Sequence, residues 1–220
     1  MSQPVPPQLV VHCRMLHFGW LPADPEAVAA TVPPGLRLRD DRRVFLQQYV
    51  VDDAVQTSGL DSYSATGLGP ELDLPDSGAA RWYTQHLSSS PLAQAQAAVR
   101  GVPAGAGRTT IEITGQALVA VAEVDGAALI RTTARIGRQV TRVYRGHTRY
   151  VSRLGDRLTG ACCPYVFEPV TPFEIESVEF LAPDHPVFAL RPANPLELLW
   201  GFYSPRSSFA LPGSEGWSRY

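Results

Sequence analysis

The alternation of hydrophobic and polar positions along the chain predicts mostly β-structure. Residues 44–51 (VFLQQYVV) are β-branched and aromatic, which is typical of a strand. Two longer runs, 111–124 and 127–136, flank Asp125-Gly126, and Asp-Gly between two such runs is a strong indicator of a β-hairpin. A second hairpin is expected around Gly155-Asp156. Further strands are expected near 165–167 and 173–180, and the last apolar run, 196–211, is interrupted by Ser204-Pro205-Arg206.

Two short helices interrupt this β pattern. Within residues 23–32, Asp24 is placed to cap a helix and Pro25 stands at its first position, where proline is favoured. The same cap-then-proline signal recurs at Ser90-Pro91, and the helix that it begins is expected to end before Gly101. The chain is therefore interpreted as a mainly β (α+β) protein.

The chain shows no internal repeat and no clean domain boundary. Residues 1–11 begin with a proline-rich stretch and are expected to form an extended N-terminal arm. Residues 12–220 are expected to form a single domain, which is long enough to bury its own core. Residues 57–69, rich in Gly and Ser with one aromatic, are expected to be a loop.

Composition narrows the chemistry, because none of the 220 residues is lysine although 19 are arginine. Either genomic base composition or selective loss of lysine explains this skew. Only a lysine side chain forms the Schiff base used in much keto-acid chemistry, so imine-forming mechanisms on a side chain are excluded. The net charge of −2 argues against a nucleic-acid binder.

No cofactor, metal or targeting signal is found in the sequence. Cys13, Cys162 and Cys163 are too few for a disulfide framework, and no spacing typical of a zinc site occurs. The N-terminus lacks a basic start followed by an apolar run, and no window has 18 consecutive apolar residues. We therefore expect a cytoplasmic protein that uses neither a cofactor nor a metal and does not enter the membrane.

Three segments together resemble the acetoacetate decarboxylase superfamily. In the first, Arg14 opens a strand, Asp24 caps a helix ten residues later, and a V-P-x-x-L element follows at 32–36. The second, 58–67 (SGLDSYSATG), is similar to the family's S-G-L-x-x-Y-x-E-x-G loop. The third is the helix from Ser90 that runs into Val-Pro-Ala-Gly, where the family has Pro-Lys-Lys. The resemblance is close over about residues 12–115 and implies a closed, cone-like antiparallel β-barrel with an internal pocket and short flanking helices.

The departures from the family pattern concern its reactive residues. The family's lysine pair, of which the first forms the Schiff base, corresponds to Ala104 and Gly105 here. Its loop glutamate corresponds to Ala65, whereas its arginine is kept as Arg14. The resemblance therefore implies a pocket that has lost the imine apparatus and retained one cation.

Three residues are candidate catalytic groups. Arg14, on a mostly apolar strand, would hold a carboxylate or enolate, although a structural ion pair explains it nearly as well. Tyr63 and His86 would donate or accept protons in the pocket, and plain packing is the alternative for both. His17 lies three residues beyond Arg14 on the same strand and is expected to face the opposite side.

The substrate-binding wall is expected to come from small and polar residues around the same pocket: Ala65, Tyr83, Gln96, Pro103, Ala104 and Gly105. Gln94 and Gln96 are also consistent with a solvated helix face. The arginine-rich stretch 131–157 is interpreted as a solvated face, or as a docking surface for an acyl carrier protein.

These observations favour a Schiff-base-independent enzyme that acts on a β-keto or polyketide-like small molecule in natural-product-type biosynthesis. Cyclisation, dehydration, isomerisation and decarboxylation all fit, with an arginine stabilising enolate or carboxylate charge. The alternative is a non-catalytic protein that binds a hydrophobic metabolite. Whether the chain is a homo-oligomer stays open.

Overall fold

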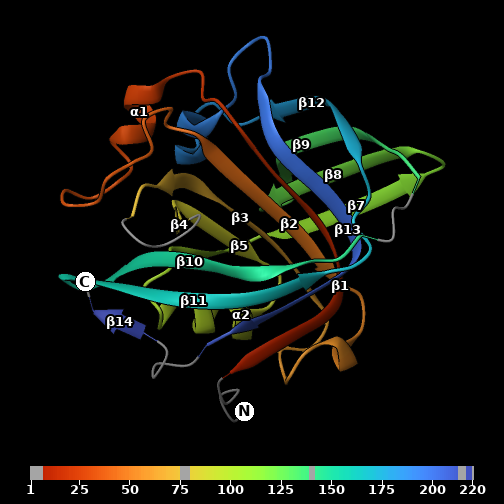
Figure 1. The fold of residues 1–220 in the computed structure, drawn as a ribbon, viewed down its shortest axis with the longest axis horizontal. Helices are drawn as coiled ribbons and strands as arrows, with labels where there is room; N and C mark the ends of the chain where they lie inside the picture. The colour runs from red at the N-terminus through yellow and green to blue at the C-terminus, as the bar shows by residue number, and fades with distance from the viewer. Residues whose placement is uncertain (1–6, 75–79, 139–141, 213–216, 220) are drawn as a thin grey trace.

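Seven strands close into a barrel in the computed structural model, which describes residues 7–74, 80–138, 142–212 and 217–219. Each strand pairs with the next around the ring, and β2 pairs with β3 to complete it. The long hairpin of β10 and β11 crosses the front of the barrel in Figure 1. The strands, in order around the barrel, are β1 (Gln8–Trp20), β13 (Leu198–Leu211), β11 (Arg157–Phe167), β10 (Tyr144–Leu154), β4 (Ala80–Trp82), β3 (Tyr63–Leu72) and β2 (Val44–Val51).

The mainly β barrel predicted from the sequence is confirmed, with one difference in strand direction. The pairs around the ring are antiparallel, as predicted, except for β4–β10, which is parallel. Three short strands extend the barrel: β5 (Gln85–Ser88) pairs with β3, β6 (Ala104–Ala106) pairs with β5, and β14 (Trp217–Arg219) pairs with β11.

A second, four-stranded antiparallel sheet packs against the outside of β1, β2 and β3. It consists of β7 (Arg108–Thr114), β8 (Ala117–Val124), β9 (Ala127–Ile136) and β12 (Phe173–Phe180), and it lies on the right of Figure 1. Leu16, Phe18 and Leu46 from the barrel meet Leu118 and Ile130 of this sheet in the largest core cluster. Both faces of β1 are consequently buried.

Two α-helices and two 3₁₀-helices lie beside the strands. The helices are α1 (Pro25–Ala29), α2 (Pro91–Ala98), η1 (Ala54–Gln56) and η2 (Pro186–Leu190). The predicted caps are confirmed: the Asp24 carboxylate accepts a hydrogen bond from the Ala27 amide at 2.9 Å, and the Ser90 hydroxyl accepts one from the Ala93 amide at 3.3 Å. No helix in the described part of the chain is both long and apolar enough to span a bilayer.

Two sequence-based boundaries are wrong. The run 111–124 is divided into β7 and β8 by a turn at Gly115, where φ is +62°. The expected loop 57–69 contains strand β3 from Tyr63 onward, and every residue of β3 is buried. The last apolar run forms strand β13, which continues through Pro205. Residues 8–11 of the predicted arm belong to β1, and the arm's first six residues lie outside those described.

The arginine-rich stretch forms exposed strand faces, as the sequence indicates, and its residues 139–141 lie outside those described. Arg131 and Arg135 on β9 pair with Glu179 and Glu176 on β12, at 3.7 and 3.1 Å. The docking of an acyl carrier protein stays a prediction.

Candidate functional site

The barrel encloses a cavity of about 70 Å³ between its strands and helix α2. Apolar and aromatic side chains together form most of the wall, which is the composition typical of small-molecule sites. Five tyrosines contribute to it: Tyr49, Tyr63, Tyr83, Tyr150 and Tyr165. The charged and strongly polar groups on the wall are His17, Gln47, Arg81, His86, Gln96 and Arg100.

Arg81, on strand β4, is the most unusual group in the cavity. The residue is only 6% exposed, and its Nε and Nη1 atoms have no hydrogen-bond partner in the structure. The guanidinium lies between two rings, with Cζ 4.9 Å from the centre of Phe45 and 5.3 Å from that of Trp200. Cation–π contact offsets part of the cost of burying the charge, but unpaired guanidinium N–H groups are rare in protein interiors. An anion in the cavity would satisfy them.

His17 faces the same cavity from strand β1. Its ring makes an edge contact with Trp200 at 4.9 Å, so it rests on the same indole as Arg81. The residue is 3% exposed, and neither ring nitrogen has a hydrogen-bond partner. Burial holds the pKa of His17 well below its usual value, and the charge of Arg81 lowers it further. The imidazole is therefore neutral when the cavity holds no anion.

Tyr83 connects this region to the middle of the barrel. Its hydroxyl donates a hydrogen bond to Oε1 of Gln47 at 3.2 Å, and its ring stacks on Tyr150 at 4.9 Å. The ring passes over Gly67, where a Cβ atom would lie 2.5 Å from Cε1 of Tyr83. Burial raises the pKa of Tyr83 well above its usual value, so the phenol remains protonated.

Tyr49 and Tyr63 form a second phenol pair, deeper along strands β2 and β3. Their hydroxyl oxygens are 3.1 Å apart. Burial raises the pKa of both groups. Both phenols are thus neutral hydrogen-bond donors and acceptors at physiological pH.

His86 and Cys163 lie near the second cation, Arg100, which follows helix α2. Burial lowers the pKa of His86 to about 4, and the charge of Arg100 contributes to the decrease. Nδ1 of His86 has no hydrogen-bond partner. Burial raises the pKa of Cys163 to about 12 against the opposing charge of Arg100, so this thiol is not a thiolate nucleophile at neutral pH.

No aspartate or glutamate occurs among the described residues that line the cavity. Among the described residues, the one buried carboxyl group belongs to Glu71, which stands opposite Arg81 in the register of strands β3 and β4. Burial raises its pKa, and the charge of Arg81 is the largest opposing influence.

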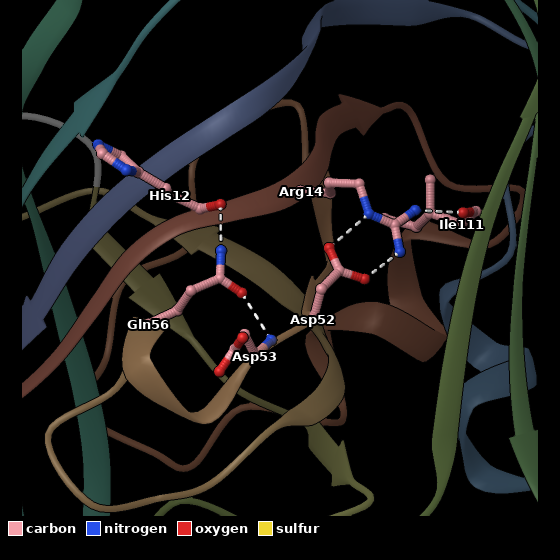
Figure 2. A network of polar contacts seen from close by, with 6 residues as sticks. All are labelled: His12, Arg14, Asp52, Asp53, Gln56 and Ile111. Atoms are coloured by element: carbon pink, nitrogen blue, oxygen red, sulfur yellow. Dashed lines mark hydrogen bonds and ion pairs between the residues drawn. The ribbon is translucent and has the colours of Figure 1, made fainter.

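Arg14, the predicted cation, lies on the opposite face of β1 and does not line the cavity. Figure 2 shows its guanidinium held by Asp52 and by the backbone carbonyl of Ile111 on β7. The distances to the Asp52 oxygens are 2.8 and 2.6 Å, and this hydrogen bonding raises the pKa of Arg14. The ion-pair alternative therefore describes Arg14, and the predicted opposite orientation of His17 is confirmed.

The other predicted residues divide into two groups. Tyr63, Tyr83, His86 and Gln96 all line the cavity, as predicted. Four more predicted residues do not, namely Ala65, Pro103, Ala104 and Gly105.

Local packing explains the second group. Ala65 is buried in the cluster around Tyr49, and residues 104–106 form strand β6 beside β5. A Cβ atom on Gly105 would lie 3.2 Å from the Gln85 side chain rather than in open space. Among the described residues, no group of three or more His, Cys, Asp or Glu side chains is arranged to hold a metal ion.

The sequence interpretation missed Arg81 and Arg100 and did not assign His17 or Gln47 to the pocket. One signal for Arg81 was present: it lies two residues before Tyr83 on a short extended segment, so both side chains face the same side of that strand. No comparable signal marks Arg100, because its position depends on where helix α2 ends.

A solved structure of acetoacetate decarboxylase superposes on the whole arrangement with a TM-score of 0.74. The match covers 99% of this chain and 90% of the other, at 14% sequence identity. The chain has the acetoacetate decarboxylase fold. No protein-family model and no curated protein sequence matches it.

Two further structures share the acetoacetate decarboxylase fold with this chain. The enduracididine biosynthesis enzyme MppR, complexed with pyruvate, has a TM-score of 0.72 and 12% identity, over 100% of this chain and 91% of MppR. Acetoacetate decarboxylase from Legionella pneumophila has a TM-score of 0.71 and 12% identity, over 100% and 90% of the two chains. At these identities the comparison establishes the fold alone.

Proposed function

We propose that the chain is an enzyme that acts on a small carboxylate-bearing carbonyl compound inside the barrel, without forming a Schiff base. The observation that carries the proposal is the buried guanidinium of Arg81, which directs unpaired N–H groups into an aromatic cavity beside His17. A guanidinium in this setting suits a carboxylate or an enolate, both of which accept hydrogen bonds from two of its nitrogens.

The titratable groups then have separate roles. When a base removes an α-proton, or when a β-carboxylate is released as CO₂, the electron pair of the broken bond moves to the carbonyl oxygen, and Arg81 stabilises the negative charge there. Tyr83, which lies on the Arg81 side of the cavity, keeps its proton at neutral pH and donates a hydrogen bond to the same oxygen in place of its bond to Gln47. Tyr63, whose pKa burial also raises, remains a neutral hydrogen-bond donor on the part of the wall near Arg100. Burial and then the charge of Arg81 lower the pKa of His17 in the empty cavity. A bound anion offsets the charge of Arg81, so His17 accepts a proton more readily in the complex.

The solved structures with this fold support this class of substrate. MppR, a biosynthesis enzyme, has been solved with pyruvate and with the condensation product of pyruvate and imidazole 4-carboxaldehyde. Cyclisation, dehydration, isomerisation and decarboxylation of an enolisable carbonyl compound are all consistent with these groups, and a natural-product-type pathway is the proposed setting.

A second candidate function is a non-catalytic binding protein for a small anionic, largely apolar metabolite. The specific observation in its favour is that no cavity group with a resolved pKa shift titrates near neutral pH in the empty protein. The pKa values of His17 and His86 are lowered, and those of the buried tyrosines are raised.

Deuterium exchange separates these two functions. The protein is incubated with pyruvate or acetoacetate in D₂O, and the protons next to the carbonyl group and the appearance of acetone are followed by NMR. An enzyme accelerates exchange or decarboxylation above the rate in buffer, and Arg81→Gln removes the acceleration. Saturable binding with exchange at the buffer rate supports the binding protein instead. Absence of both overturns both functions.

Borohydride trapping tests the absence of an imine. Borohydride with acetoacetate should leave the mass of the intact protein unchanged, apart from reaction at the N-terminal amine, because the chain has no lysine. A trapped adduct elsewhere in the chain contradicts the proposal.

A further inference from the structure

A second guanidinium, that of Arg100, faces the same cavity from a different element. Arg100 follows α2, and its carbonyl accepts a hydrogen bond of 2.7 Å from the Ser152 hydroxyl on β10. The chain turns after the helix at Gly101, where φ is +74° and a Cβ atom would lie 2.2 Å from the Arg153 carbonyl oxygen. The backbone beside Arg100 is therefore held by β10 rather than free in solvent.

The charge of Arg100 acts inside the cavity. It contributes to the lowered pKa of His86, after burial, and it opposes the burial-driven rise in the pKa of Cys163 and of Tyr63. Arg81 acts on a separate set of groups, His17, Tyr150 and Glu71. The charges of the two arginines thus act on side chains in different parts of the cavity wall.

The cavity carries these two cations without an acidic partner on its wall. Within the described residues, the ion pairs formed by side-chain carboxylates use other arginines: Arg14, Arg37, Arg43, Arg131 and Arg135. The Glu71 carboxyl, opposite Arg81 across strands β3 and β4, offsets part of the Arg81 charge but does not line the cavity, and Arg100 is half-buried without a carboxylate partner on the wall. Two like charges that face one cavity repel each other, so an anion that enters it is favoured. A ligand with one carboxylate would contact only one of the two cations.

From this we infer that the cavity takes a small dianionic ligand of the oxo-dicarboxylate class, with one carboxylate at Arg81 and the other at Arg100. The inference rests on the proposed function, in which Arg81 binds the substrate anion, and adds a second anchoring point. A cavity of about 70 Å³ favours one short ligand with two charges over two separate ligands. Two anchors also orient the carbonyl group between the carboxylates relative to His17 and Tyr83.

Calorimetry with matched inert probes tests this inference. Succinate and butyrate have the same number of carbon atoms but differ by one carboxylate, and malonate and propanoate form a second such pair. In the wild-type protein the dicarboxylate should bind about tenfold or more tightly than its partner, because a hydrogen-bonded ion pair is gained. Arg100→Gln should abolish this difference, because it removes the anchor for the second carboxylate.

The variants distinguish failure of the inference from failure of the proposed function. Arg81→Gln should remove binding of both acids, whereas Arg14→Gln, outside the cavity, should change neither. Equal affinity for succinate and butyrate in the wild type overturns the second anchor and leaves the proposed function standing. No binding of either acid overturns both. If Arg100→Gln lowers the melting temperature, Arg100→Met is used in its place, because methionine keeps the apolar stem of the side chain and removes only the charge.

Discussion

The guanidinium carbon of Arg81 lies 5.3 Å from the centre of the Trp200 ring, and the ring of His17 contacts the same indole at 4.9 Å. One side chain on β13 therefore positions both the cation and the imidazole of the proposed site. Trp200 has this position because Gly19, on the neighbouring strand β1, has no side chain: a Cβ atom there would lie 2.7 Å from Nε1 of the indole.

Gly19→Ala should therefore disturb the site without changing any group that touches the ligand. The indole has to move, which takes away the support of Arg81 and His17, and overpacking of this kind costs about 1–3 kcal/mol of unfolding free energy. We expect weaker binding of succinate by calorimetry together with a lower denaturation midpoint. Gly137→Ala is the matched control, because its Cβ atom would be 3.4 Å from the nearest atom. Unchanged affinity in Gly19→Ala would contradict a role for Trp200 in positioning the cation.

Binding of an anion should be accompanied by uptake of a proton. In the empty cavity, burial and then the charge of Arg81 lower the pKa of His17. A bound carboxylate offsets that charge, so the pKa of His17 is higher in the complex and the complex holds more protons than the free protein. Affinity should thus increase as the pH falls, and the binding enthalpy should depend on the ionisation enthalpy of the buffer.

His17→Gln should remove most of this proton uptake. The other charged or ionisable side chains on the cavity wall, namely Arg81, Arg100, His86, Cys163 and the five tyrosines, are all present in that variant and serve as the internal control. Proton uptake that persists in full in His17→Gln assigns the coupling to one of these groups instead.

Acid should destabilise the protein through its cavity histidines. The pKa of His86 is lowered to about 4, whereas the unfolded chain has the ordinary value of about 6.5, so the unfolded state binds more protons between these two values. The contribution of neutral His86 to the free energy of unfolding is therefore fully present above pH 6.5 and is lost as the pH falls toward 4. Because the residue is partly exposed, we expect a loss on the order of 1 kcal/mol between pH 6.5 and 5.

Urea denaturation at several pH values checks this expectation. His86→Gln should be less sensitive to acid than the wild type, and His147→Gln, which replaces an exposed histidine, should match the wild type. Equal acid sensitivity in all three proteins would show that His86 is not held neutral by its surroundings.

The sequence predicted local elements well where one residue type determines the geometry. Strand β2 was predicted within its observed bounds, and the caps Asp24 and Ser90 begin the two helices. Boundaries failed where tertiary contacts override local signals. Tyr63 begins a fully buried strand in a stretch whose Gly and Ser content is typical of a loop, because the neighbouring strands β2, β4 and β5 pair with it.

The candidate site was predicted only in part, for a reason that lies in strand β1. Alternation correctly placed Arg14 and His17 on opposite faces, but both faces of this strand are buried, one by the second sheet and one by the barrel interior. The pattern of the strand alone therefore does not distinguish the cavity face from the outer face. That distinction depends on the pairing of β7, β8, β9 and β12, which is a property of the whole fold.

Replacing each of the two arginines in turn gives the most direct test of this reassignment. Arg14 forms an ion pair with Asp52, and the two side chains are 30% and 51% exposed, respectively. Such exposed pairs contribute about 0–1 kcal/mol to the free energy of unfolding. Arg14→Gln should therefore lower stability slightly and leave anion binding and turnover intact. Arg81→Gln should remove both, because it deletes the only cation that contacts the indole of Trp200 among the described residues. Chemical denaturation measures the stability of the two variants, and calorimetry measures their anion binding. If binding is lost in Arg14→Gln but not in Arg81→Gln, the anion binds at the outer face of β1 instead.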